Sequence, residues 1–155
     1  MTSDRLVLPG GIARSMTPNE MKTRTKSFAL RVIKLVDAMP RGLVGQVIGR
    51  QLLRSATSVG ANYRAACRAQ SRAEFAAKLS IVVEEADETL YWLELLKESG
   101  LIKADRLVEL FKESNELLAI SISSRKTSKQ PTKAKGVQPS TSIVNRQSSI
   151  GNLTI

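Results

Sequence analysis

Carboxylates form the densest group of potentially catalytic side chains in this 155-residue sequence. Four acids crowd into residues 84–88: Glu84, Glu85, Asp87 and Glu88. Two of them form a Glu-x-x-Glu pair, and the same spacing returns at Glu113 and Glu116. Such pairs on two helices can hold Mg²⁺ on the phosphates of a nucleotide, so a Mg-dependent nucleotide pyrophosphohydrolase is one alternative. Because Glu85 and Glu88 share a helix face with Ile81 and Trp92, we favour ion pairs with arginines across a subunit contact.

The rest of the composition excludes most enzyme classes. There is no histidine, which rules out a Ser/His/Asp triad, a Cys/His dyad and a His-ligated metal site. The single cysteine, Cys67, has no partner for a disulfide and no base to activate it, so we predict a small packing residue. We therefore expect a protein that is not an enzyme and that needs no metal or cofactor.

Basic residues are the second candidate for chemistry, because the net charge is +10 and is unevenly distributed. Residues 17–70 hold ten Lys and Arg against two acids, whereas residues 71–124 hold six against eleven. The first segment therefore predicts a phosphate-contacting surface for RNA or DNA. Its candidate residues are Lys22, Lys26, Arg31, Lys34, Arg50, Arg54, Arg64 and Arg68. The competing interpretation is that basic and acidic segments pair with each other, within or between subunits.

Four amphipathic helices must position these side chains. Capping-box patterns at Thr17-Pro18-Asn19-Glu20 and Ser71-Arg72-Ala73-Glu74 predict two helix starts, and Pro40-Arg41-Gly42 and Gly100 predict two ends. The expected helices are 18–39, 43–68, 72–99 and 103–124, joined by short turns. They predict an all-α, up-down-up-down antiparallel four-helix bundle over residues 17–124. Residues 1–16 are predicted to be a flexible leader, and residues 125–155 a disordered basic tail rich in Ser, Thr and Lys.

Two helices carry more apolar or small surface than one small bundle can cover, which predicts a homo-oligomer. In the second helix, the apolar residues expected on the core face are Val44, Val47 and Ile48. The same face carries four polar residues: Gln51, Ser55, Ser58 and Asn62. We predict that these four form hydrogen bonds within the bundle, and the alternative is that they line a ligand pocket. A line of small residues on the opposite side is expected to meet a neighbouring subunit. The predicted interface consists of Gly49, Leu53, Ala56, Gly60, Ile81, Glu85, Glu88, Trp92 and Leu95.

The stretch from Gly49 to Ala66 resembles a family signature, because polar residues at these spacings are unusual on a bundle core face. Its core is Gln51-Leu-Leu-Arg-Ser-x-x-Ser-Val-x-x-Asn62, and the match continues through Glu84-Glu-Ala-Asp-Glu-Thr-Leu-Tyr-Trp-Leu93. The pattern is similar to the four-helix-bundle proteins encoded in intervening sequences of bacterial large-subunit ribosomal RNA genes. Ala65 and Ala66 depart from the Glu-Gly that many members carry after the Asn.

The resemblance implies a bundle fold, ring-shaped homo-oligomers with five subunits expected, and no attached enzymatic activity. It also implies kinship with the accessory variability protein of diversity-generating retroelements, which binds nucleic acid and a reverse transcriptase. Together with the charge, it predicts a non-enzymatic oligomer that binds RNA or DNA with low sequence specificity. A protein-only scaffold with an unidentified protein partner is the alternative. A cytoplasmic location is expected, since no apolar run suits a membrane span and the start of the chain lacks a signal-peptide pattern.

Overall fold

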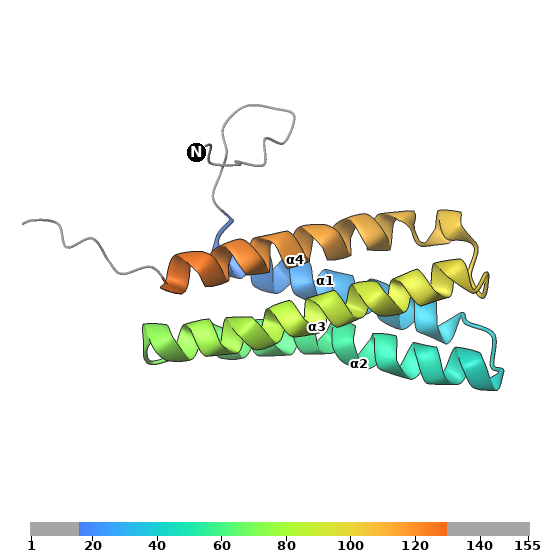
Figure 1. Ribbon diagram of the computed structural model, residues 1–155, viewed down its shortest axis with the longest axis horizontal. Helices are drawn as coiled ribbons and strands as arrows, with labels where there is room; N and C mark the ends of the chain where they lie inside the picture. The colour runs from blue at the N-terminus through green and yellow to red at the C-terminus, as the bar shows by residue number, and fades with distance from the viewer. Residues whose placement is uncertain (1–15, 130–155) are drawn as a thin grey trace, which may run out of the picture.

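The computed structural model describes residues 16–129, and these form an antiparallel bundle of four helices (Figure 1). The helices are α1 (Pro18–Asp37), α2 (Leu43–Ala66), α3 (Arg72–Glu98) and α4 (Val108–Lys129), with a short 3₁₀ turn, η1 (Ala104–Arg106), before α4. Each helix packs beside the next one in the chain, and α2 with α3 makes the most extensive contact, whereas α1 with α4 makes the smallest contact among the four neighbouring pairs. The predicted all-α, up-down-up-down architecture is confirmed.

The helix boundaries are set by capping residues that can be recognised in the sequence. The Thr17 side chain accepts a hydrogen bond from the Glu20 amide and the Glu20 carboxylate accepts one from the Thr17 amide, which completes the predicted capping box of α1. The Ser71 hydroxyl accepts a hydrogen bond from the Glu74 amide and begins α3. After α3, Gly100 adopts a φ of +67°, the left-handed conformation that a glycine accepts without strain.

The apolar stripe of α1 lies in the core of the bundle. Its buried side chains recur at three- and four-residue intervals, and they are Met21, Thr25, Phe28, Val32 and Leu35, followed by Met39 after the helix. The other helices contribute mainly leucine, valine and alanine, among them Leu52, Leu79, Leu93 and Leu117. Leu-rich packing of this kind is the main stabilising contribution to such a bundle.

The predicted core face of α2 is wrong at its first turns. Val44 and Val47 were expected inside, yet they are 56% and 52% exposed. The buried face is rotated toward the line of small residues and consists of Gly45, Gly49, Leu52, Ser55, Ala56, Val59, Tyr63 and Ala66. Small residues occupy these core positions because they let the backbone of α1 approach α2 closely. A Cβ atom on Gly49 would lie 3.2 Å from a methyl carbon of Val36.

The fourth helix begins and ends later than predicted. A short 3₁₀ turn occupies residues 104–106, and α4 then continues to Lys129, five residues beyond its expected end at Ser124. Arg125, Lys126 and Lys129 are therefore held on a helix. The rest of the predicted tail, residues 130–155, and nearly all of the predicted leader, residues 1–15, lie outside the described residues.

Candidate nucleic-acid interface

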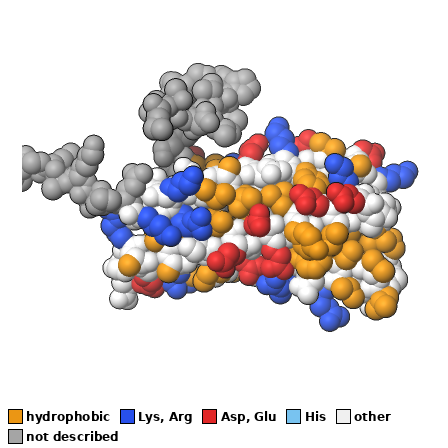
Figure 2. All heavy atoms as spheres, in the orientation of Figure 1, with side chains coloured by type: hydrophobic (Ala, Val, Ile, Leu, Met, Phe, Trp, Pro, Cys, Tyr) orange, Lys and Arg blue, Asp and Glu red, His pale blue; other side chains and the backbone are white. Residues whose placement is uncertain are grey.

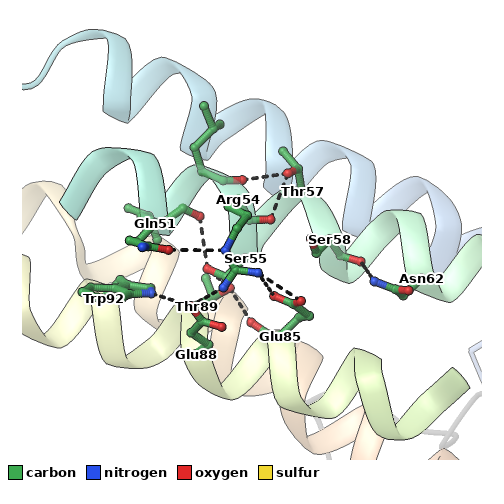
Figure 3. Close-up of polar contacts among 12 residues, drawn as sticks. Gln51, Arg54, Ser55, Thr57, Ser58, Asn62, Glu85, Glu88, Thr89 and Trp92 are labelled. Carbon is green, nitrogen blue, oxygen red and sulfur yellow. Dashed lines mark hydrogen bonds and ion pairs between the residues drawn. The ribbon is translucent and has the colours of Figure 1, made fainter. Parts of the chain in front are cut away.

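The acidic cluster of α3 pairs with an arginine of the same chain. Arg54 on α2 donates hydrogen bonds to Glu85 and Glu88, and the indole nitrogen of Trp92 donates to Glu88 at 3.0 Å (Figure 3). The hydrogen bond from Arg54, with a second one from Trp92, lowers the pKa of Glu88. Glu85 and Glu88 therefore have an arginine partner within their own bundle, and their contact with a neighbouring subunit stays a prediction.

The second Glu-x-x-Glu pair is also engaged within the chain. Arg24 on α1 donates from Nε to Glu113 at 2.6 Å, and its Nη2 bonds both Glu113 and Glu116. The two acidic pairs thus bind two different arginines, one on α2 and the other on α1. In residues 16–129 no group of three or more Asp, Glu, His or Cys side chains is placed to hold a metal ion. The convergent carboxylates that a Mg-dependent pyrophosphohydrolase requires are not formed.

The polar residues predicted on the core face of α2 bond within the bundle. The hydroxyl of Thr89 on α3 lies 3.0 Å from the hydroxyl of Ser55, and this pair is buried between the helices (Figure 3). Asn62 donates to the carbonyl of Ser58 at 2.9 Å, and Gln51 accepts from Arg54. Each hydroxyl also bonds a carbonyl of its own helix, Ser55 that of Leu52 at 3.3 Å and Thr89 that of Glu85 at 2.7 Å, so both polar groups are satisfied where α2 meets α3.

The structure brings only part of the predicted phosphate-contacting set together. Gly60 on α2 lies against Thr25 on α1, so the end of α2 is level with the start of α1. Lys22, Lys26, Arg64 and Arg68 consequently belong to the same end of the bundle. The other candidates are elsewhere: Arg54 is in its ion pair, while Arg31, Lys34 and Arg50 are exposed at other positions along the bundle.

Antiparallel packing adds basic residues that the sequence pattern did not group with them. The start of α3 and the end of α4 lie at this same end, and they contribute Arg72, Lys78, Arg125, Lys126 and Lys129. Figure 2 shows Lys and Arg side chains gathered there, over the end of α4 and the start of α3. The missed signal was the alternation of helix direction, which places residues near 22, 68, 72 and 126 together.

We call this region the basic end and define it as residues 16–26, 60–80 and 118–129. It contains ten Lys and Arg against two acids, whereas the rest of the described chain contains nine against eleven. Seven of its cations form no ion pair within 4 Å among residues 16–129: Lys22, Lys26, Arg64, Arg68, Arg125, Lys126 and Lys129. The charge of the bundle is therefore polarised along its long axis.

Two of the small residues predicted to meet a neighbouring subunit lie inside the subunit instead. Ala56 is fully buried, Gly49 packs against Val36 and Met39, and Gly60 packs against Thr25. For Gly49 and Ala56 the interface prediction is wrong, because both are buried where α1 approaches α2 closely. Gly60 is half-buried, and its place in a subunit contact stays a prediction. Leu53 is half-buried on the same helix.

An apolar face remains at the other end of the bundle. It combines α2 residues that were predicted to be core with α3 residues that were predicted to be interface, and Figure 2 shows it as a broad apolar area over the two helices. Leu43, Val44 and Val47 are 78%, 56% and 52% exposed. On α3, Tyr91 is exposed and packs edge-on against Trp92, while Trp92 and Leu95 are half-buried. Ile81, which is 42% exposed, lies nearer the start of α3 and away from these residues. We call Leu43, Val44, Val47, Tyr91, Trp92 and Leu95 the apolar face.

Comparison with known proteins agrees with this architecture. The model of the 23S rRNA-intervening sequence protein family matches residues 18–123, which covers all of the bundle except the last turn and a half of α4. The chain belongs to the 23S rRNA-intervening sequence protein family. The family resemblance inferred from the α2 signature is thereby confirmed.

A solved structure of the same kind supports the assignment. It is the crystal structure of a protein of unknown function from the S23 ribosomal protein family of Bacteroides thetaiotaomicron, 40% identical, with a TM-score of 0.64. The match covers 72% of this chain and 99% of that one. No curated protein matches the chain. Within residues 16–129, none of the helices has the length and apolar character needed to cross a membrane.

Proposed function

We propose that this member of the intervening-sequence family is a non-enzymatic homo-oligomer that binds RNA or DNA through phosphates at its basic end. The observation that carries the proposal is the axial separation of charge. Ten basic residues and two acids surround one end of the bundle, and seven of the cations are without an ion pair among the described residues. A polyanion is the partner that such an end attracts most strongly.

The arrangement favours backbone contacts over recognition of bases. The cations come from four different helix ends, so they form a cap around the bundle end and no single helix presents them as a row. The sequence contains no recognition-helix, zinc-finger or aromatic-platform motif. Low sequence specificity follows.

The apolar face supports the oligomeric part of the proposal. Contiguous apolar side chains at this exposure are typical of subunit contacts, and a second copy of the chain supplies a matching surface. This face lies away from the basic end, so contact through it leaves the cations accessible. In a ring, which the family resemblance implies with five subunits, equivalent basic ends repeat around the symmetry axis and weak contacts add as avidity.

A salt titration tests the nucleic-acid proposal. Binding of the full chain to labelled single-stranded and duplex RNA and DNA is measured from low to high salt. On duplex DNA the expected slope of log K against log salt is about −0.9 per phosphate neutralised, with several phosphates per subunit. Absence of binding at low salt, or binding that ignores salt, contradicts the proposal.

The protein-only scaffold is distinguished by a nuclease experiment. Partners captured from a native lysate are compared before and after nuclease treatment. Nucleic-acid bridging predicts that the captured proteins are released by nuclease, whereas a scaffold keeps them. Retention of the same proteins after complete digestion overturns nucleic-acid binding as the main activity.

A further inference from the structure

A hollow lies at the basic end, where the start of α1, the turn from α2 to α3 and the last turns of α4 meet. Its volume is about 850 Å³, which is within the usual range for small-molecule sites. The phosphate contacts proposed above explain the cations around this end. They do not explain an open cavity between the helices.

The hollow has an apolar and aromatic side and a side lined by hydroxyl groups. Apolar and aromatic side chains, Tyr63, Ala66 and Phe75, come from α2 and α3. Hydroxyls come from α4, and among the described residues those of Ser123 and Ser124 have no hydrogen-bond partner. An aromatic wall opposite unpaired hydroxyls suits a ligand with one flat apolar surface and several polar groups.

A cation completes the site. Lys22 lines the hollow and forms no ion pair within the described part of the chain. Arg72 also lines it and donates to the carbonyls of Thr127 and Ser128, at 3.4 and 3.5 Å. Two helix starts and two helix ends meet here, so the helix dipoles oppose one another and the side-chain charges dominate.

Tyr63 offers a neutral hydroxyl at the base of the hollow. It is 9% exposed, and burial raises its pKa to about 12, with a smaller contribution from Cys67. A tyrosine phenol is protonated at physiological pH even without this shift, so the wall bears no negative charge that would repel a phosphate. Flat aromatic surface, neutral polar groups and a nearby cation are the components that bind a base together with its phosphate.

We propose that this hollow holds one unstacked nucleotide of a single strand, with the base against the half-buried ring of Phe75, the buried Tyr63 behind it, and a phosphate at Lys22. The inference rests on the proposed function and adds a preference to it. A duplex keeps its bases stacked and cannot place one in the hollow without paying for unstacking, so single strands bind more tightly than duplexes at equal salt.

The test fills the hollow without changing the charge. Ser124→Phe places a ring in the cavity, and Ala119→Phe, at an exposed position of the same helix outside the lining, is the matched control. Affinity of the full chain is measured for a single-stranded oligonucleotide and for its duplex. Ser124→Phe is expected to weaken single-strand binding about tenfold and to leave duplex binding within about twofold, whereas Ala119→Phe leaves both unchanged.

The outcomes separate this inference from the proposed function. Equal single-strand affinity for the two variants, with salt-dependent binding retained, overturns the hollow and leaves the basic end intact. Failure of the wild-type chain to bind either form at low salt overturns both. If Ser124→Phe does not fold, as judged by thermal unfolding, photo-crosslinking of the wild-type chain to a 4-thiouridine strand decides. Crosslinked peptides that contain Tyr63 or Phe75 support the site, and crosslinks only at other peptides contradict it.

Discussion

The two ends of this bundle are built from the same four helices, yet they differ in charge, packing and surface. The basic end is open, with a hollow of about 850 Å³ and ten basic residues against two acids. The opposite end is tight: a Cβ on Gly45 would lie 2.2 Å from the carbonyl oxygen of Pro40, and Leu43, Val44 and Val47 stand in solvent. One end suits an anionic ligand and the other suits a second copy of the chain.

The contrast teaches how antiparallel packing redistributes charge. Along the sequence, the first two helices are basic and the last two are acidic. In the bundle, Glu85 and Glu88 of α3 are paired with Arg54, and Glu113 and Glu116 of α4 are paired with Arg24. At the basic end, by contrast, ten cations stand beside only two acids. A contrast between two halves of the chain becomes a contrast between two ends of the molecule.

The largest expected effect comes from reversing charge at one end only. Arg68→Glu, Lys126→Glu and Lys129→Glu combined are expected to weaken nucleic-acid binding about 100-fold at constant salt, because three attractive contacts become repulsive. Arg50→Glu, Lys103→Glu and Arg106→Glu change the net charge equally away from the basic end and are expected to cost less than about fivefold. Similar losses in titrations of the two triple variants would mean that net charge, and not the basic end, governs binding.

The apolar face is tested by introducing one charge into it. Val47→Glu is expected to dissociate the oligomer to a 16.9 kDa monomer, because a carboxylate must then be buried at the subunit contact. Val108→Glu is the matched control, since Val108 is 57% exposed and lies on α4, outside the apolar face. Sedimentation equilibrium at micromolar concentration gives both masses. A Val47→Glu chain that keeps the wild-type mass excludes this face as the contact.

The tight turn at the end opposite the basic end predicts a loss of stability. Gly45→Ala is expected to lower the free energy of unfolding by about 2 to 3 kcal/mol, because the added methyl group meets backbone and not a movable side chain. Gly42→Ala has open space around its Cβ and should cost less than about 1 kcal/mol. Urea denaturation of the two variants measures the difference, and equal midpoints would show that the turn has room to relax.

The smallest predicted effect is a pH dependence at the basic end. Burial raises the pKa of Tyr63 to about 12, so between pH 10 and 12 the folded chain holds a proton that the unfolded chain has released. This stabilisation is complete below pH 10 and is lost as the pH rises through the window. The free energy of unfolding, measured at pH 9 and 11.5, should fall more steeply for the wild-type chain than for Tyr63→Phe. Parallel pH profiles would contradict the buried phenol.

Much of the fold could be predicted from local patterns. The capping box at Thr17 and the helix end at Gly100 each depend on neighbours within a few residues, and both are confirmed. The face of α2 was harder, because glycine and alanine count as neither strongly apolar nor polar. Their burial is decided by how closely α1 approaches, which is a property of the assembled bundle.

The candidate site shows the same limit. Lys22 and Arg68 were identified from their charge alone. In the sequence, Arg54 looks like an equally good candidate, yet in the bundle it forms ion pairs with Glu85 and Glu88. Lys126 and Lys129 were assigned to a disordered tail, since the last turns of α4 have no strong apolar stripe of their own. Which cations remain unpaired depends on contacts between helices, and those contacts join residues more than thirty positions apart.

Hydrogen exchange of the full chain with and without a single-stranded oligonucleotide tests the central claim most directly, because it locates the bound strand along the bundle. The account predicts added protection in peptides from the start of α1, the turn from α2 to α3 and the last turns of α4. Peptides from the turn between α1 and α2 and from residues 84–98 should exchange as in the free protein. Protection concentrated at that opposite end, or spread evenly along α1 and α2, would contradict a binding surface at the basic end.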